Sequence, residues 1–262
     1  MITVMGATGN VGRPLVRELA AAGEQVTAVS RQETAEVPEG VRVVPGVESA
    51  LDGAEALFLM VPGGFAPLDG VLAAARTAGV GRVVVLSSQG VATGRHPAVL
   101  EDSVRASGLE WTMLRPGGFA SNAFQWAESV RSARRVAAPF GDVALPVIDP
   151  EDIAAVAASA LLSDRSGDVY DLTGPAAITP RQQAAAIAEA LGEPVEFVQR
   201  TPEEARAAML GFMPPEVADV TLGILGAPTP QEQRVSPDVS RVLGRPPRPF
   251  TEWVARNAAA FK

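Results

Sequence analysis

A glycine-rich turn near the start of the chain limits the possible folds more than any other feature. Gly6-Ala7-Thr8-Gly9-Asn10-Val11-Gly12 directly follows a short apolar run, residues 2–5, and precedes an amphipathic stretch, residues 14–22. Small residues between a strand and a helix let backbone N–H groups approach a pyrophosphate at the helix N-terminus, which is how dinucleotides bind. A tight strand-to-helix turn without a ligand is the alternative interpretation.

Short apolar runs alternate with amphipathic stretches through the first half of the chain. Runs typical of buried strands recur at residues 25–30, 41–44, 56–61, 83–87 and 111–115. Helix candidates at residues 68–78 and 98–107 separate the last three runs. This alternation predicts an α/β fold with a Rossmann-type, doubly wound parallel sheet. The interval 44–56 is short for a crossover helix, so we expect a turn there instead.

After residue 115 the pattern becomes richer in proline and in helix signals. A helix candidate covers residues 153–162, one more strand is expected at 169–173, and the remainder is mainly helical. We expect residues 1–149 to form the nucleotide-binding domain, with strand 169–173 added to its sheet. Residues 150–262 are expected to form a smaller C-terminal helical cap on the substrate side, interleaved with the sheet.

Composition and charge exclude several classes of function. The chain has no cysteine and a single histidine, so disulfides, thiolate nucleophiles and multi-histidine metal sites are excluded, and we expect no metal. The formal net charge of −8 at pH 7 would repel the phosphate backbone of a nucleic acid, so no nucleic-acid partner is expected. Neither a membrane segment nor a signal peptide is evident, so we expect a cytoplasmic protein.

The residue after the second strand discriminates between the two nicotinamide dinucleotides. Val29-Ser30-Arg31 offers no acidic residue to accept a hydrogen bond from a free ribose 2′-hydroxyl, whereas Arg31 suits a 2′-phosphate. One charge-assisted hydrogen bond of about 1.5 to 3 kcal/mol favours NADP over NAD by roughly tenfold to a hundredfold. We therefore predict NADP(H) as the cofactor. A solvated surface arginine is the alternative.

Further short motifs lie along the chain, at Ser87-Ser88 and at residues 107–117, 149–154 and 170–175. With these motifs and the glycine-rich turn, nearly the whole chain resembles the NmrA-like group of atypical short-chain dehydrogenases/reductases. This group includes NAD(P)H:quinone reductases, isoflavone-reductase relatives and redox-sensing regulators.

The resemblance also implies a path for the cofactor. Its diphosphate would lie over the glycine-rich turn and its 2′-phosphate at Arg31. The nicotinamide half would then run along a further set of residues: Met60, Val61, Pro62, Ser87, Pro116 and Gly117.

A catalytic pair that the resemblance implies is absent. Members with full reductase machinery carry a Tyr-x-x-x-Lys pair before the Trp-Thr-x-Leu-Arg-Pro strand, and these places hold Thr93 and Pro97 here. The only tyrosine, Tyr170, lies in an expected strand, and the only lysine is Lys262. General acid catalysis usually contributes about 10² to 10⁴-fold, so its loss would cripple the reduction of an ordinary ketone. A quinone or conjugated aromatic acceptor demands less, because its developing charge is delocalised.

His96 lies between those two places and is the candidate proton donor. It is the only side chain whose ordinary pKa lies near neutrality. An exposed loop histidine without a catalytic role is the alternative.

A substrate pocket is expected beside the nicotinamide. Ser88, at the end of a buried strand, is a candidate for substrate contact, and local capping of the following turn is the alternative. Phe119, Asn122 and Phe212 are expected to form part of the pocket wall.

Two classes of function follow. The first is an NADPH-dependent reductase of a quinone-like or conjugated aromatic small molecule. The second is a protein that binds the dinucleotide without turnover, as a redox sensor or as a pocket for a non-redox cyclisation or rearrangement. The missing Tyr/Lys pair favours the second class. The sequence leaves the oligomeric state open, a homodimer being one option.

Overall fold

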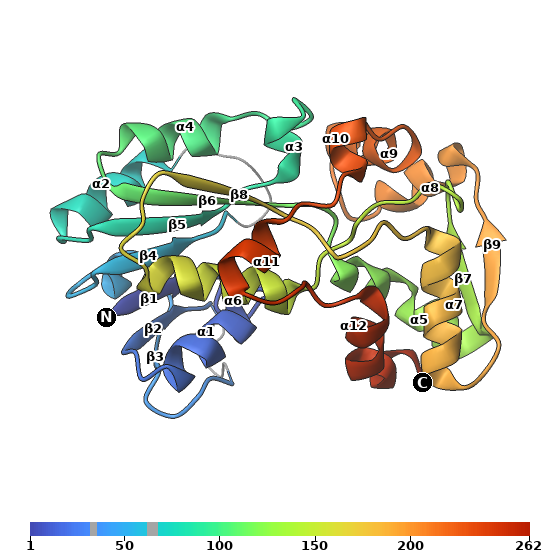
Figure 1. Ribbon diagram of the computed structural model, residues 1–262, viewed down its shortest axis with the longest axis horizontal. Helices are drawn as coiled ribbons and strands as arrows, with labels where there is room; N and C mark the ends of the chain where they lie inside the picture. The colour runs from blue at the N-terminus through green and yellow to red at the C-terminus, as the bar shows by residue number, and fades with distance from the viewer. Residues whose placement is uncertain (32–35, 62–67) are drawn as a thin grey trace. The chain divides into compact units, whose positions relative to one another are not determined.

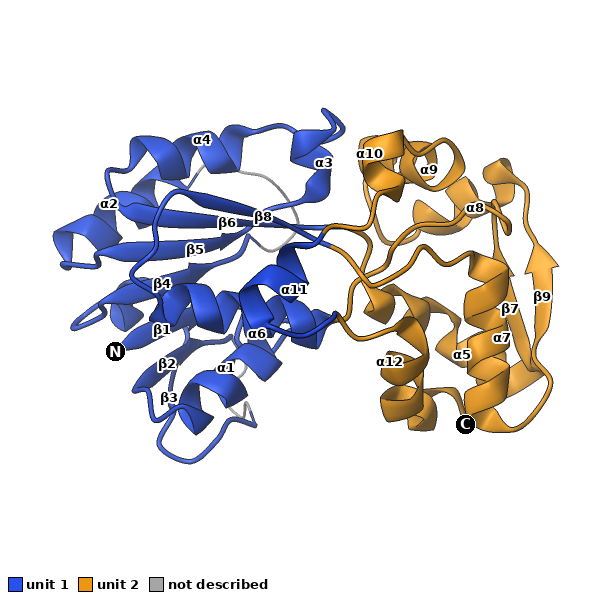
Figure 2. Ribbon diagram, viewed as in Figure 1, with its two compact units in different colours: residues 1–116, 150–172, 237–246 blue, residues 117–149, 173–236, 247–262 orange. Residues whose placement is uncertain are grey.

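The computed structural model describes residues 1–31, 36–61 and 68–262 and divides into two compact units (Figures 1 and 2). Unit 1 consists of Met1–Pro116, Pro150–Leu172 and Pro237–Pro246. Unit 2 consists of Gly117–Asp149, Thr173–Ser236 and Pro247–Lys262.

A seven-stranded parallel sheet forms the centre of unit 1. Its strands, in spatial order, are β3 (Arg42–Val44), β2 (Val26–Val29), β1 (Ile2–Met5), β4 (Ala56–Leu59), β5 (Arg82–Leu86), β6 (Glu110–Pro116) and β8 (Asp168–Leu172). The strand order reverses between β1 and β4, which makes this edge the topological switch point where ligands of such sheets bind. The predicted Rossmann-type fold is confirmed.

Helices cover both faces of the sheet in unit 1 (Figure 1). On one face α2 (Asp69–Thr77) and α4 (Val99–Ala106) pack against β4 and β5 through a buried cluster that includes Leu57, Val83 and Leu100. On the other face α1 (Gly12–Ala21) packs against α6 (Pro150–Leu162). The short interval after β3 contains only a 3₁₀ turn, Glu48–Ala50, as expected from its length.

The remaining elements of unit 1 are short. They are α3 (Gln89–Ala92) and α11 (Asp238–Leu243). In the part of the chain that the structure describes, no helix has the length and apolarity needed to cross a membrane.

Unit 2 is mainly helical. Its elements are η2 (Ala120–Trp126), α5 (Ala127–Ala133), β7 (Arg135–Ala138), α7 (Pro180–Leu191), β9 (Glu196–Gln199), α8 (Pro202–Met209), α9 (Pro215–Gly226), α10 (Pro230–Gln233), α12 (Phe250–Asn257) and η3 (Ala258–Phe261). Strands β7 and β9 pair in parallel. Its core is built from η2, α5, β7, α7, α12 and η3 and includes Trp126, Val130, Phe250, Trp253 and Phe261.

Threonine-proline pairs begin three helices of unit 2. Thr179, Thr201 and Thr229 each accept a hydrogen bond from a backbone N–H three residues ahead, and the Gln or Glu side chain at that position bonds back to the threonine N–H. This capping box, with proline at the first helical position, satisfies amides that would otherwise lack partners. The prolines of this half of the chain therefore mark where helices begin.

The two units divide the chain differently from the expectation of a nucleotide-binding domain at residues 1–149, completed by strand 169–173, and a cap at residues 150–262. Helix α6 belongs to unit 1, because it is buried against α1 and the sheet. Helix α11 packs on α6 and β8, and Arg245 beyond it bonds Asp152 of α6 with Nη2 2.8 Å from Oδ1. Residues 117–149 fall in unit 2. A substrate-side role for residues 150–262 remains a prediction.

Candidate functional site

The glycine-rich turn connects β1 to α1 at the switch point of the sheet, and its glycines meet different needs. Gly6 has a left-handed φ of 65°, and a Cβ there would overlap the side chain of Met60. A Cβ at Gly12 would overlap the backbone carbonyl of Gly6, so helix and turn meet at Gly12 too closely for any side chain. Gly9 is exposed, and a Cβ there would meet only the Gly6 carbonyl oxygen, at 3.3 Å.

The beginning of α1 differs from that of every other α-helix in the described chain. Its N-cap residue is Val11, which makes no side-chain capping hydrogen bond, and its first turn contains no acidic residue. Each other α-helix has a capping side chain, an acidic residue in its first turn, or both. The positive end of the α1 dipole is therefore left for an anion, as a diphosphate requires. Within the first turn of α1, the Arg13 N–H bonds the carbonyl of Gly9 at 3.0 Å and Pro14 has no N–H.

Arg31 lies beside this turn. Strand β2 pairs with β1 in parallel up to Val29 opposite Met5, so the chain leaves both strands at one edge of the sheet. The buried Ser30 follows, and its N–H bonds the carbonyl of Val44 at 2.9 Å. Arg31 itself is exposed, as a side chain that binds a ribose phosphate must be.

The other residues expected along the cofactor follow the neighbouring strands of unit 1. Met60 and Val61 come directly after β4 and are half-buried, and Ser87 comes directly after β5. Pro116 ends β6 and the first segment of unit 1, and Gly117 is the first residue of unit 2. Pro62 lies outside the described residues.

A buried carboxylate fixes Ser87. The Ser87 hydroxyl donates to Oε1 of Glu101 on α4 at 2.6 Å, and the Glu101 side chain is completely buried. Arg115 on β6 donates to the same carboxylate from Nε at 2.8 Å and from Nη2 at 2.7 Å, and Arg105 adds a bond of 2.8 Å. Because the Ser87 proton is held by Glu101, Ser87 can meet a ligand only as an acceptor.

Glu101 is ionised because its hydrogen-bond and charge partners lower the pKa of its carboxyl more than burial raises it. Burial alone would raise the pKa of this carboxyl, but the hydrogen bonds from Arg115 and Ser87 and the charge of Arg115 lower it below its ordinary value. Sequence reasoning missed Glu101 as a functional residue. The available signal was its position between Leu100 and Val104, on a helix whose buried positions are otherwise apolar.

Ser88 and His96 form a pair in unit 1. Ser88 is the N-cap of α3 and accepts from the N–H of Gly90 at 3.1 Å, so the expected local capping is observed. The Nδ1 atom of His96 lies 3.0 Å from Ser88 Oγ. The imidazole ring lies directly against Gly90, so close that it would overlap a side chain there. His96 is therefore half-buried, which corrects the alternative of an exposed loop residue. If Ser88 donates to Nδ1, the proton of a neutral ring lies on Nε2.

Three of the four residues expected in the substrate pocket line one cavity of unit 2. Phe119, Asn122 and Phe212 surround a cavity of about 420 Å³, together with mainly apolar residues of η2, α8 and α9. Phe212 is nevertheless 70% exposed. Ser88 belongs to unit 1 and does not line this cavity.

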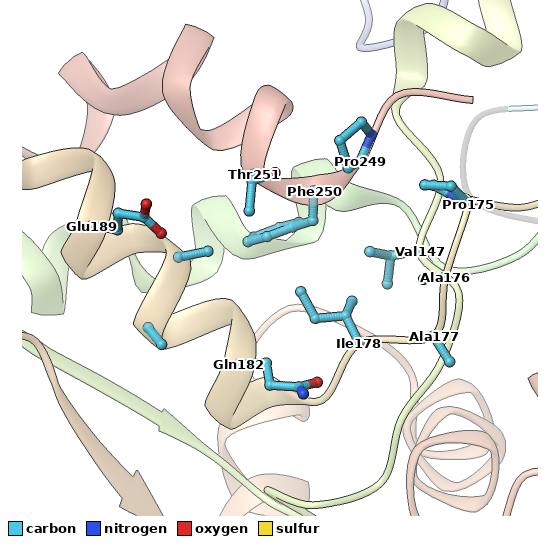
Figure 3. Close-up of a pocket in the computed structure, with 12 residues that line it drawn as sticks. Val147, Pro175, Ala176, Ala177, Ile178, Gln182, Glu189, Pro249, Phe250 and Thr251 are labelled. Carbon is cyan, nitrogen blue, oxygen red and sulfur yellow. The ribbon is translucent and has the colours of Figure 1, made fainter. Parts of the chain in front are cut away.

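A second pocket, of about 390 Å³, lies between the loop before α7, α7 itself and the start of α12 (Figure 3). Phe250 points across this pocket toward α7. Val147 and Ile178 line both hollows. Glu189 is the only charged residue among the residues that line this second pocket.

Residues 6–164 match the model of a protein family described as NAD(P)H-binding. This chain belongs to that family. The described glycine-rich turn falls at the start of the matched region and the Glu101 network lies within it.

Curated relatives cover the whole chain. The (4-alkanoyl-5-oxo-2,5-dihydrofuran-3-yl)methyl phosphate reductase of Streptomyces griseus is 39% identical, over 100% of this chain and 99% of the relative. The NAD(P)H azoreductase of Xenophilus azovorans is 34% identical, with the same coverage of both chains.

Solved structures show the same architecture. The NADPH-dependent quinone oxidoreductase of Escherichia coli, solved in complex with NADPH, superposes with a TM-score of 0.80 at 25% identity, over 98% of this chain and 99% of that one. The negative transcriptional regulator NmrA, solved with NADP, has a TM-score of 0.71 at 20% identity, over 97% and 94% of the two chains. The likeness to NmrA shows the shared fold, and the predicted membership of an NAD(P)H-binding family is confirmed by the match over residues 6–164.

Proposed function

We propose that this protein is an NADPH-dependent reductase of a small conjugated acceptor of the quinone-like or aromatic class. The observation that carries the proposal is the uncapped, acid-free beginning of α1 behind a turn whose Gly12 admits no side chain. The backbone amides of this turn would hold the diphosphate, and Arg31 would bind the 2′-phosphate. Bound there, NADPH supplies a hydride, and the protein contributes orientation and exclusion of water.

Within this proposal, the Glu101 network keeps Ser87 in one orientation. Ser87 would accept a hydrogen bond from a hydroxyl of the cofactor, since its own proton is held by Glu101. Arg115 and Arg105 keep the carboxylate ionised and stationary. Glu101 thus acts through Ser87, as a positioning residue.

Tyr170 does not serve as the general acid. The phenol of Tyr170 donates to Asp168 Oδ2 at 2.7 Å, and burial together with this hydrogen bond raises its pKa above the ordinary value. Such a phenol does not release its proton readily. His96, oriented by Ser88, is the proposed proton source, and water can protonate a delocalised product without help.

The names of the relatives support a conjugated acceptor. The S. griseus relative is named for a 2,5-dihydrofuran with 5-oxo and 4-alkanoyl groups, in which a ring double bond is conjugated to carbonyl groups. The other relatives act, by name, on azo compounds and quinones. All three kinds of compound can accept a hydride at a conjugated system and spread the resulting charge.

The test is the consumption of NADPH, followed by its absorbance, with menadione, an azo dye, a conjugated enone and the saturated ketone cyclohexanone. We expect turnover with at least one conjugated acceptor and none with cyclohexanone. NADPH binding without turnover of any acceptor would contradict a reductase and favour the redox-sensor alternative. Turnover of cyclohexanone at a comparable rate would contradict the argument from the missing acid.

A further inference from the structure

The larger cavity of unit 2 is apolar except for a few polar groups, and only one of its lining residues is charged. Phe119, Trp126, Met209 and Leu225 are among its apolar walls. Arg200, directly after β9, is the charged residue. We infer that the substrate of this cavity has an apolar body and an anionic group, such as a carboxylate, sulfonate or phosphate, which Arg200 binds. The inference rests on the proposed function in taking this cavity as the substrate site.

Arg200 differs from most arginines of its unit. Seven of them form ion pairs with carboxylates: Arg131 with Glu128, Arg134 with Glu193, Arg135 with Glu196, Arg181 with Asp142, Arg206 with Asp219, Arg248 with Glu252, and Arg256 with Asp149. Among the described residues, neither Arg200 nor Arg234 has a carboxylate partner. Only Arg200 of these two lines the cavity. A guanidinium left unpaired beside an apolar cavity is suited to an anion that arrives with the ligand.

Hydrogen bonds fix the backbone at Arg200, and its side chain is exposed. The Arg200 N–H bonds the carbonyl of Ala138 at 3.0 Å, which continues the pairing of β9 with β7, and Ala138 also lines the cavity. The next residue, Thr201, caps α8, and its N–H bonds Glu204 Oε2 at 2.9 Å. The nearby Glu204 side chain therefore already takes part in the capping box of α8, and Glu204 does not line the cavity.

Neutral donors accompany the arginine. Asn122 and Gln183 line the same cavity, and within the described ranges their amide side chains have no hydrogen-bond partner. Amide groups can donate to an anionic oxygen or accept from a hydroxyl. A ligand anion next to Arg200 would thus find further donors without disturbing an existing bond.

The neighbouring pocket supplies an internal contrast. It shares Val147 and Ile178 with the larger cavity, but its only charged lining residue is Glu189 (Figure 3). The positive charge of Arg200 therefore favours an anion in the larger cavity, whereas the negative charge of Glu189 disfavours one in the second pocket. This difference assigns the anionic group to the larger cavity.

Calorimetry with the full chain tests the inference without any turnover. The probes are 2-naphthoate and 2-naphthamide, which share an aromatic body and differ in charge. We expect Arg200→Gln to weaken 2-naphthoate binding roughly tenfold, since it removes a charge-assisted contact. The affinity for 2-naphthamide should stay within about twofold. Arg200→Lys should retain part of the preference, and Arg234→Gln, which changes an arginine outside the cavity, should leave both affinities unchanged.

Three results would overturn the inference: equal loss of both probes in Arg200→Gln, an equal effect in Arg234→Gln, or no binding of either probe to the unmodified protein. Because the readout is binding, it is separate from the reductase proposal. Failure to consume NADPH with any acceptor would count against the reductase alone, and a charge preference erased by Arg200→Gln would still support the anion site.

Discussion

Two sites of the molecule, one in each unit, use their polar side chains in opposite ways. In unit 1, Glu101 is completely buried and bonded by Ser87, Arg105 and Arg115. In unit 2, the cavity is lined by Arg200 and Asn122, whose side chains have no partner among the described residues. The same cofactor binds in every turnover, so groups that contact it gain from being fixed in advance. Unpartnered groups are suited to a substrate that brings its own polar atoms.

The largest effect in this contrast is expected at Gly12. Gly12→Ala places a methyl group against the Gly6 carbonyl, which must shift, so we expect a loss of about 3 kcal/mol in the free energy of unfolding. NADPH affinity should fall at least tenfold, because the turn that presents the amides moves. Denaturant unfolding and calorimetry measure the two effects.

Gly70 supplies the control for this substitution. It is an exposed glycine in α2 with nothing within contact distance of an added Cβ. Gly70→Ala should raise stability by about 0.5 to 1 kcal/mol and leave NADPH affinity unchanged. If the two variants behave alike, the close approach at Gly12 has no special importance.

Breaking the buried network should have the next largest effect. Glu101→Gln removes the charge that compensates Arg115, and we expect about 3 kcal/mol of destabilisation at neutral pH, seen in denaturant unfolding. Asp102, its neighbour, is exposed and meets Arg105 only at 3.4 Å. Asp102→Asn should therefore change stability by less than about 0.5 kcal/mol. A similar loss in both variants would contradict the network.

The same network predicts a pH dependence. The folded pKa of Glu101 lies below its ordinary value of 4.5, so the ionised carboxylate stabilises the fold fully above that value. The contribution is lost as the pH falls through the lowered folded pKa. The stability difference between the unmodified protein and Glu101→Gln should thus shrink below pH 4.5. A difference that stays constant down to strongly acidic pH would show that Glu101 is not ionised in the fold.

Arg31→Ala tests which dinucleotide the first unit prefers. NADPH should bind roughly tenfold to a hundredfold more weakly, whereas NADH, which lacks the 2′-phosphate, should bind as before. Arg17, exposed on α1, is the matched control, and Arg17→Ala should alter neither affinity. Equal weakening of NADPH and NADH by Arg31→Ala would show that Arg31 does not recognise the 2′-phosphate.

The smallest of these effects is expected at His96. His96→Gln should lower turnover of a conjugated acceptor by about tenfold, less than usual for a general acid, because charge delocalisation assists the reaction. NADPH affinity should not change. Steady-state kinetics at neutral pH are the measurement, and unchanged turnover would remove His96 from the mechanism.

Most of unit 1 could be predicted because the central strands of its sheet are buried on both faces. Such strands appear in sequence as short apolar runs, and β4, β5 and β6 lie where those runs occur. The glycine-rich turn could be recognised for a similar reason, since its requirement for small residues is local in sequence.

Unit 2 was less predictable because its contacts are not local. Strands β7 and β9 are short and half-exposed, and Arg135 pairs with Glu196, far along the chain. Their alternation is too brief to indicate strands. Glu101 was missed for a related reason, since a charged residue on a helix usually faces solvent and only the fold brings Arg115 and Ser87 to it.

The central claim is that a dinucleotide diphosphate binds at the glycine-rich turn, next to the positive end of the α1 dipole. Isothermal titration calorimetry of the full chain with NADPH and with NADH tests it most directly. We expect micromolar binding of NADPH, weaker binding of NADH, and loss of both in Gly12→Ala. The absence of heat with both dinucleotides would contradict it.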